Sequence, residues 1–323
     1  MIRAVVRGIG HYLPERVVPN EWFTTFLDTS DEWIKSRSGI ERRHFAAEGE
    51  YTSDLAIHAA RAALDDAGLV PDDIDAIVLA TSTPDLTFPA TATIVQAGLG
   101  MTRGFAFDVQ AVCAGFVFAL ANANGMIVSG QARRVLVIGA ETFSRILNWE
   151  DRGTCVLFGD GAGALILEAA EGAGDASDRG ILATDLHSDG RLRDILQVSG
   201  GVSTSQTSGH LMMAGKEVFR HAVEKLAQST LDVLARAGVT TDQIDRVVPH
   251  QANIRIITRT AAKLDLPMEK VVVTVQDHGN TSAASIPLAM AVAKAKGALQ
   301  PGHLIVTEAI GGGLSWGAVV LRW

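Results

Sequence analysis

The chain repeats itself at a spacing of about 170 residues. The segment Asp73 to Val78 is echoed by Gln243 to Val248, and each copy follows a helical pattern that ends in Ala-Gly. Two further pairs of strand-like runs recur in the same order, 135–138 with 304–307 and 163–167 with 317–321. Matches in one shared order favour an internal duplication over the ordinary alternation of α/β units. We therefore expect two similar halves, residues 1–172 and 173–323, packed about a pseudo-twofold axis.

Each half alternates short β-branched runs with longer helical patterns, which is typical of an α/β fold with parallel strands. The predicted strands are 76–80, 104–108, 134–139, 162–168, 181–186, 246–249, 270–275, 304–308 and 317–322. The predicted helices include 52–67, 113–129, 216–237, 254–264 and 283–295.

Composition excludes several classes of protein. The net charge of −8 argues against a general nucleic-acid binder. Two cysteines, Cys113 and Cys155, are too few for a disulfide framework, and no metal-ligand cluster is recognisable. The first eight residues read as a strand rather than a signal peptide, and no apolar run approaches the length of a membrane span. We expect a cytoplasmic protein without a membrane or nucleic-acid partner.

Cys113 lies where the predicted strand at 104–108 gives way to a helix of small apolar residues. Unpaired amides at a helix start stabilise a thiolate and lower its pKa, and they can also hold the oxyanion of a thioester under attack. The alternative is that Cys113 is a small buried hydrophobe, which is common for a free cysteine. Cys155 lies within an apolar run and is expected to be inert core.

The repeat predicts what faces Cys113. Its equivalent in the second half is Ala283, just after Asn280, so the pseudo-twofold axis would bring Asn280 toward the sulfur. His250 directly follows the strand at 246–249, at a strand end where α/β enzymes gather functional side chains. Asn253 is a suitable N-cap for the helix that begins at 254. A lone histidine is more often structural, but three polar groups at converging ends favour a functional site.

Three motifs resemble those of a known family: Val112-Cys113-Ala114-Gly115-Phe116, Pro249-His250-Gln251-Ala252-Asn253, and His278-Gly279-Asn280-Thr281-Ser282-Ala283-Ala284-Ser285. They resemble the signatures of β-ketoacyl-acyl-carrier-protein synthase III, the initiating condensing enzyme of type II fatty acid synthesis. The likeness extends from Tyr12-Leu13-Pro14 to Gly311-Gly312-Gly313. It implies a thiolase-like fold of two duplicated α/β halves in five αβαβα layers. Related elongating synthases have a second histidine, and thiolases a second cysteine, where this chain has Asn280.

The resemblance implies a catalytic set of Cys113, His250 and Asn280. Cys113 would take an acyl group from acyl-CoA, with acetyl-CoA the expected donor, and the Cys113 and Gly313 amides would form the oxyanion hole. Malonyl-acyl carrier protein would then lose carbon dioxide and attack the acyl-Cys113 carbonyl. His250 and Asn280 would stabilise the resulting enolate; an amide cannot act as a base. The CoA thioester is a substrate, and no permanently bound cofactor or metal is expected.

The resemblance also assigns residues to substrates and partners. Trp33 and Arg152 match the pair that stacks on the adenine of CoA, as an indole face and a guanidinium plane can do. Other positions along the CoA channel are matched by Thr29, Arg37, Gly215 and Asn253. Phe88 matches an aromatic residue that closes the acyl pocket of the partner in a homodimer. Each could instead be an ordinary surface or packing residue, and Phe88 could be a core residue at a helix start.

Arg255, Arg259 and Lys263 recur every four residues on the helix after His250, forming a basic stripe on an acidic protein. A solvated helix face is the usual explanation. The resemblance instead places the docking of acyl carrier protein here, through Gln251, Ala252, Asn253, Ile254 and Arg255. Lys216 and Arg220 would extend the stripe. An acidic carrier would be steered to it with a salt-sensitive association rate.

Two other functions remain open. Cys, His and Asn occur in the order found in papain-like hydrolases, but the Cys-Gly-Ser/Ala-Cys-Trp/Tyr setting of those enzymes is absent. A related Cys-His-Asn condensing enzyme of secondary metabolism, using CoA thioesters, is the closer alternative. The basic stripe favours a carrier-protein partner only modestly.

Overall fold

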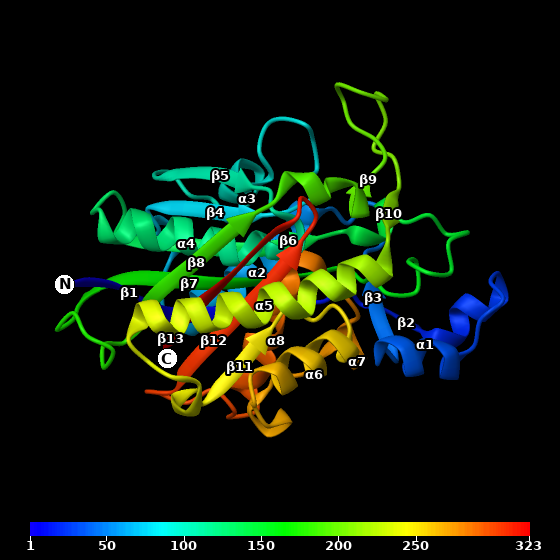
Figure 1. The fold of residues 1–323 in the computed structure, drawn as a ribbon. Coiled ribbons are helices and arrows are strands. Elements are labelled where there is room, and N and C mark those ends of the chain that lie inside the picture. The colour runs from blue at the N-terminus through cyan, green and yellow to red at the C-terminus, as the bar shows by residue number, and fades with distance from the viewer.

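Two β-sheets form the centre of the protein in the computed structural model, which describes all of residues 1–323 (Figure 1). The first has the strand order β1-β7-β6-β4-β5 and the second β11-β12-β13-β8. The first sheet comprises β1 (Ile2–Tyr12), β4 (Ala76–Ala80), β5 (Phe105–Val109), β6 (Arg134–Glu141) and β7 (Gly161–Glu171). The second comprises β8 (Gly180–Ser188), β11 (Arg246–Pro249), β12 (Leu304–Gly311) and β13 (Ser315–Arg322).

The two sheets have the same strand order when each strand of the first half is matched with its repeat in the second half. β1, β7, β6 and β4 of the first sheet correspond to β8, β13, β12 and β11 of the second. In both, the pairing is mixed: β4 with β6 and β11 with β12 are parallel, whereas β7 and β13 run antiparallel to their neighbours. The expectation of parallel strands therefore holds only for part of each sheet. The short turn between β12 and β13 requires antiparallel pairing, because a parallel connection needs a long crossover.

The strand predicted at 270–275 is wrong. This segment forms only an isolated bridge between Val271 and Val247. The side chain of Gln251 explains why: its amide group donates to the Val272 carbonyl, and its oxygen accepts from the amides of Thr274 and Val275. A side chain satisfies the backbone groups that a neighbouring strand would otherwise bond. The second sheet therefore lacks a counterpart of β5.

The helices form three layers around the two sheets, which confirms the five-layered thiolase-like α/β fold (Figure 1). α2 and α3 cover the outer face of the first sheet, α4 and α8 lie between the sheets, and α5 and α6 cover the second sheet. The helices are α1 (Asp31–Ser38), α2 (Thr52–Ala67), α3 (Thr91–Leu99), α4 (Gly115–Val128), α5 (Gly215–Ala237), α6 (Ile254–Lys263), α7 (Val275–His278) and α8 (Ser285–Ala295). No helix combines the length and apolar character that a membrane crossing requires.

The strand sequences explain the layering. In β6, Val135 and Val137 face the central helices, while Leu136 and Ile138 face α2 and its neighbours. A strand whose successive residues are all apolar must be covered on both faces, because neighbouring side chains point to opposite sides. Gly139 on the same strand permits a close approach of the 3-10 turn at Ser282–Ala284, which precedes α8: a Cβ there would lie 2.2 Å from the Ala283 carbonyl oxygen.

Short elements form a cap over one end of the layers. Two small sheets pair β2 (Arg16–Pro19) with β3 (Arg42–Phe45) and β9 (Leu196–Val198) with β10 (Leu211–Met213). Their apolar residues join one cluster that includes Phe143, Phe158 and Ile310. The 3-10 helices are η1 (Asn20–Thr25), η2 (Pro71–Asp73), η3 (Val112–Ala114), η4 (Phe143–Ile146), η5 (Gly190–Ile195), η6 (Thr241–Gln243), η7 (Met268–Lys270) and η8 (Ser282–Ala284).

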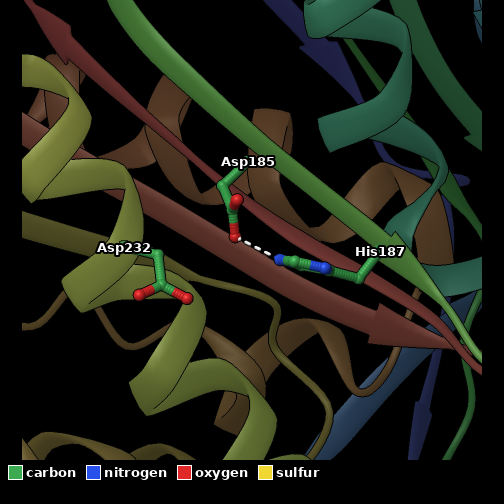
Figure 2. A group of neighbouring side chains, drawn as sticks. All are labelled: Asp185, His187 and Asp232. Atoms are coloured by element: carbon green, nitrogen blue, oxygen red, sulfur yellow. Dashed lines mark hydrogen bonds and ion pairs between the residues drawn. The ribbon is translucent and has the colours of Figure 1, made fainter.

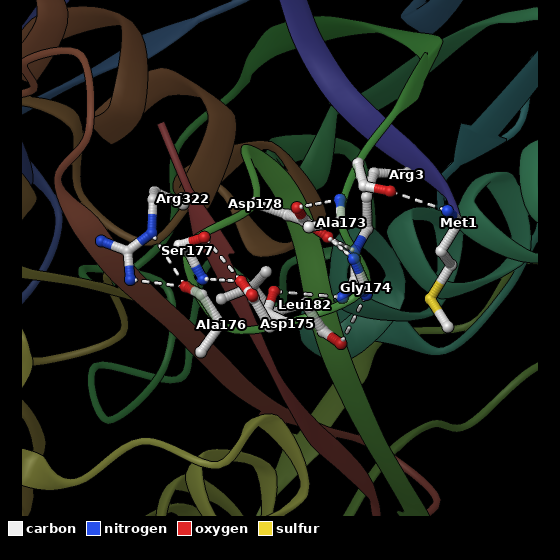
Figure 3. Close-up of polar contacts among 11 residues, drawn as sticks. Met1, Arg3, Ala173, Gly174, Asp175, Ala176, Ser177, Asp178, Leu182 and Arg322 are labelled. Atoms are coloured by element: carbon white, nitrogen blue, oxygen red, sulfur yellow. Dashed lines mark hydrogen bonds and ion pairs between the residues drawn. The ribbon is translucent and has the colours of Figure 1, made fainter.

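The segment between β7 and β8, residues 172–179, is tied to both ends of the chain (Figure 3). Arg3 forms an ion pair with Asp178 at 2.9 Å, and Arg322 donates to the Ala176 carbonyl. The amino group of Met1 donates to the Gly172 carbonyl at 2.7 Å. The predicted boundary at residue 172 lies at the start of this segment.

Candidate active site

Cys113 lies in the single 3-10 turn, η3, that joins the end of β5 to the start of α4. Its side chain is buried and lines a cavity of about 680 Å³. The predicted strand-to-helix position is confirmed, although the helix proper begins two residues later, at Gly115. The first-turn amides of α4 therefore lie next to the sulfur-bearing residue.

The start of α8 faces the start of α4 across the centre of the molecule. η8 precedes α8 as η3 precedes α4, and the two 3-10 turns are in contact. A Cβ on Gly115 would lie 3.4 Å from the Ala283 side chain. Small residues at both helix starts permit this approach. Asn280 lies two residues before η8, so the contact between the two turns places it near Cys113.

The cavity brings Cys113, His250 and Asn280 together, since all three line it. His250 follows β11, and its backbone amide donates to the Glu308 carbonyl at 2.9 Å. Asn280 is fixed by its own backbone, which bonds the carbonyl of Leu157 and the amide of Gly159. Three separate chain segments thus hold the three side chains at one cavity.

The orientation of the Asn280 amide follows from one hydrogen bond. The backbone amide of Ser282 donates to the Asn280 side-chain oxygen at 2.9 Å. Only the oxygen can accept, so the NH₂ group must lie on the other side of the side chain. That group is free to donate to a molecule in the cavity.

His250 is an uncharged imidazole at neutral pH. Its burial lowers the pKa to about 3, because an imidazolium loses its hydration there. Nδ1 contacts the hydroxyl of Ser285 at 2.6 Å. A neutral ring can donate a hydrogen bond from one nitrogen without carrying a positive charge into the site.

Cys113 differs from the sequence-based expectation of a lowered thiol pKa. Burial raises the pKa of Cys113 to about 12, and the charge of Glu141 acts in the same direction. The Ser282 hydroxyl and the local backbone amide oppose this rise in pKa but do not cancel it. Loss of hydration raises the pKa of the buried thiol more than the partial positive charge of the helix start lowers it. Cys113 is therefore predominantly a protonated thiol at neutral pH.

Comparison with known proteins decides the family. Residues 107–190 match the family profile described as 3-oxoacyl-[acyl-carrier-protein (ACP)] synthase III, and residues 234–323 match its C-terminal counterpart. The chain is 73% identical to β-ketoacyl-[acyl-carrier-protein] synthase III of Rhodobacter capsulatus over 322 residues, covering 100% of this chain and 99% of the relative. Its identity to the enzyme of Ruegeria pomeroyi is also 73%, over 99% of both chains. The chain belongs to the β-ketoacyl-[acyl-carrier-protein] synthase III family.

Solved structures agree with this assignment. The synthase III crystal structure from Aquifex aeolicus has a TM-score of 0.93 and 46% identity, covering 99% of this chain and 100% of that one. The structure from Pseudomonas aeruginosa has the same TM-score and identity and covers 99% and 98%. The protein is therefore an acyl-transferring condensing enzyme of a family that uses a CoA thioester as substrate.

Most of the expected CoA-binding residues line the cavity. Trp33, Arg37, Gly215 and Asn253 line the cavity, whereas Thr29 and Arg152 do not. The Arg152 guanidinium nevertheless lies over the Trp33 ring, with Cζ 4.9 Å from the ring centroid, and Arg37 lies at 4.4 Å. The Trp33 indole is thus in contact with the Arg152 guanidinium. These are the two groups that are expected to stack on either side of the adenine.

The predicted docking segment has some residues that line the cavity and others that are exposed further along α6. Lys216, Ala252, Asn253 and Arg255 line the cavity, and Arg259 and Lys263 are exposed further along α6. Asn253 caps α6, as predicted, by accepting from the Arg255 amide. Lys263 is paired with Glu224 at 2.5 Å, so the basic stripe is partly neutralised at its far end. Ile254 is half-buried against the apolar cluster of the cap.

Gln251 does not fit the docking role. The residue is 1% exposed, and its amide is used entirely by backbone groups around it, including the Pro249 and Val272 carbonyls. The expected docking contact at Gln251 is therefore wrong. Its side chain instead fixes the segment that follows η7.

Two further sequence-predicted residues lie outside the cavity lining. Gly313 is in the turn after β12, but the glycine packed against Cys113 is Gly311, the last residue of β12, where a Cβ would lie 2.7 Å from the Cys113 nitrogen. Phe88 is 84% exposed, so the alternative of a core phenylalanine is wrong. Cys155 is fully buried in the cap cluster, as expected.

Sequence reasoning assigned no role to Ser282, Ser285 or Glu141, although all three are buried beside the catalytic set. The repeat could have indicated Ser282, because it corresponds to Val112, the neighbour of Cys113. Glu141 accepts from Thr83 and from the Ser82 amide, and burial raises its pKa to about 7. No sequence signal distinguishes it from a surface glutamate.

A separate group of potential ligands, Asp185, His187 and Asp232, lies between the second sheet and α5 (Figure 2). The Asp185 carboxylate is already engaged by His187 at 2.7 Å and by Ser229 at 2.7 Å. Its other oxygen is 2.8 Å from the Arg236 guanidinium. A cation would have to displace a positive side chain, so the group is best explained as a hydrogen-bonded network that joins α5 to β8.

Proposed function

We propose that this enzyme starts fatty acid chains from an acyl-CoA, with acetyl-CoA as the preferred donor. The first half-reaction joins Cys113 Sγ to the acyl carbon and breaks the bond from that carbon to the CoA sulfur. The thiol proton leaves with CoA. The carrying observation is a single cavity lined by Cys113, His250 and Asn280, with an amide donor free to act in it.

In the second half-reaction, malonyl-acyl carrier protein enters the same cavity. Its bond to the carboxylate breaks, carbon dioxide leaves, and the remaining electron pair forms an enolate. The enolate carbon bonds the acyl carbon, and the Cys113 sulfur departs as a thiolate that takes up a proton from solvent. The products are 3-oxoacyl-acyl carrier protein, CoA and carbon dioxide.

His250 and Asn280 support the second half-reaction as hydrogen-bond donors. Negative charge on the thioester oxygen needs donors that are already in place, and losing one such donor costs on the order of 3 kcal/mol in comparable sites. The neutral state of His250 and the orientation of Asn280 both suit donation. We propose the amides of Cys113 and Gly313 as the oxyanion hole for attack on the acyl group.

The proposed binding surfaces for CoA and for the carrier protein both include residues that line the cavity. Trp33 and Arg152 would separate to receive the adenine, with Thr29, Arg37, Gly215 and Asn253 along the channel. Acyl carrier protein would dock on Lys216, Ala252, Asn253, Ile254, Arg255, Arg259 and Lys263. The exposed Phe88 suits a role at a homodimer interface, where it would close the acyl pocket of the partner subunit.

Labelling tests the proposed function directly. Protein mixed with radiolabelled acetyl-CoA is expected to retain label on Cys113, and unlabelled malonyl-acyl carrier protein should then release it as 3-oxoacyl product. Cys113→Ser should abolish labelling, and Cys155→Ser, a buried thiol outside the cavity, is the matched control. Label that survives Cys113→Ser would refute the assignment.

Condensation that runs only with malonyl-CoA would favour an enzyme of secondary metabolism. A series of acyl-CoA primers would establish the chain length that the enzyme accepts.

A further inference from the structure

We propose that Ser285 is a positioning residue for His250: its hydroxyl donates to Nδ1 and so keeps the ring proton on Nε2, the nitrogen that would donate to the substrate. The catalytic consequence rests on the function proposed above. The tautomer itself does not, and it can be measured without any substrate.

The contact joins two segments that meet only in the folded chain. Ser285 is the first residue of α8, and His250 follows β11. Ser285 Oγ lies 2.6 Å from His250 Nδ1, and both residues are buried. Such a short distance in a dry setting indicates a strong hydrogen bond, but it does not by itself say which atom donates.

A third atom decides the direction. The backbone amide of Gln251 also points at Ser285 Oγ, at 3.3 Å, and an amide nitrogen can only donate. One lone pair of the hydroxyl is therefore used. Nδ1 is the only remaining partner of Oγ in the structure, so it is the only acceptor available to the hydroxyl hydrogen.

The two tautomers are thus unequal. If Ser285 donates to Nδ1, the hydroxyl hydrogen, the Gln251 amide and Nδ1 are all satisfied, and the proton of the neutral ring is on Nε2. If Nδ1 carried the proton, the buried hydroxyl hydrogen would have no acceptor, which is a costly arrangement in a dry interior. The α8 N-terminus also places positive partial charge beside Nδ1, which disfavours a second ring proton.

This assignment gives the cavity two N–H donors. His250 lines the cavity, and its Nε2–H and the free NH₂ of Asn280 are available to one acceptor oxygen. With the opposite tautomer, Nε2 would present a lone pair and repel an enolate oxygen. Ser285 would therefore affect decarboxylation more than acyl transfer to Cys113.

Nitrogen-15 NMR of the full-length, substrate-free protein tests the tautomer. With ¹⁵N-labelled histidine and His250→Gln to assign the signals, wild type is expected to show an unprotonated Nδ1 and a protonated Nε2. Ser285→Ala should lose that preference, and Ser285→Thr, which keeps the hydroxyl, should retain it. Thr281→Val removes another buried hydroxyl from the same turn and should leave the His250 signals unchanged.

Kinetics gives the second readout. Ser285→Ala should slow condensation with malonyl-acyl carrier protein at least about tenfold while single-turnover acylation of Cys113 stays within about twofold, and Ser285→Thr should restore most of the loss. A protonated Nδ1 in wild type would overturn the proposal, even if Ser285→Ala failed to fold. An unchanged tautomer in folded Ser285→Ala would also overturn it. Absence of condensation in wild type would refute the proposed function and leave the tautomer result standing.

Discussion

Val112 and Ser282 lie 170 residues apart, and both hold left-handed backbone angles, with φ of 50° and 49°. Each begins the 3-10 turn that leads into a central helix, η3 before α4 and η8 before α8. A left-handed angle is unfavourable for a residue with a side chain, above all for β-branched valine. The duplicated halves therefore store the same strain at the same place, beside Cys113 and Asn280.

This strain predicts that Ser282→Gly raises stability. Glycine adopts the left-handed angle without the cost of roughly 1–2 kcal/mol, and the change also removes a buried hydroxyl that has no hydrogen-bond partner of ordinary geometry. After the entropy of an added glycine, the expected gain is about 1 kcal/mol. Differential scanning calorimetry should show a rise in Tm. Ser285→Gly, at a φ of −64°, is the matched control and should lower it.

Condensation should depend on the NH₂ group of Asn280, the hydrogen-bond donor, rather than on its side-chain oxygen. Asn280→Asp keeps an acceptor for the Ser282 amide but removes the free donor. Condensation is therefore expected to fall on the order of 10²-fold or more in both Asn280→Asp and Asn280→Ala. Acylation of Cys113, followed by mass spectrometry of the intact protein, should persist in Asn280→Ala. Retained condensation in Asn280→Asp would refute the donor role.

The reactivity of Cys113 should rise steadily with pH. The thiolate is the form that reacts with iodoacetamide, and burial raises the thiol pKa to about 12. Since that pKa lies far above the assay range, the thiolate fraction should grow about tenfold for each unit between about pH 6 and pH 9. Alkylation rates at Cys113, read by peptide mass spectrometry, should follow that slope.

His250→Gln provides the control for this pH profile. His250 has a pKa of about 3, so it is neutral across the assay range and forms no charged pair with the thiolate, and the variant should keep the same slope. A plateau below about pH 8 that disappears in His250→Gln would instead indicate a thiolate-imidazolium pair in the resting enzyme.

Carrier-protein docking should depend more on Arg259 than on Lys263. Lys263 is paired with Glu224, whereas Arg259 forms no ion pair in the structure. Arg259→Gln is expected to lower kcat/KM for malonyl-acyl carrier protein about three- to tenfold at low salt, with the difference fading toward about 1 M salt, where the Debye length is about 3 Å. The double variant Glu224→Gln/Lys263→Gln keeps the net charge and should stay within about twofold. Equal losses in both would contradict a docking role specific to Arg259.

Local patterns predicted most of the regular elements. The helix at 52–67 and the strand at 246–249 have the predicted bounds, because apolar periodicity and glycine caps are properties of neighbouring residues. The strand predicted at 270–275 failed for the opposite reason. Its β-branched residues suit a strand, but the backbone there bonds the side chain of Gln251, which a local pattern cannot indicate.

The sequence by itself determined the duplication, the α/β layers and the three motifs that identify the family, because each is written in residue order and spacing. Tertiary structure decided what those residues do to one another. Burial makes Cys113 a thiol and His250 a neutral ring, the Ser282 amide orients Asn280, and Ser285 reaches His250 from another segment. Protonation and donor direction depend on desolvation and on contacts between distant segments, so they exist only once the two halves have packed together.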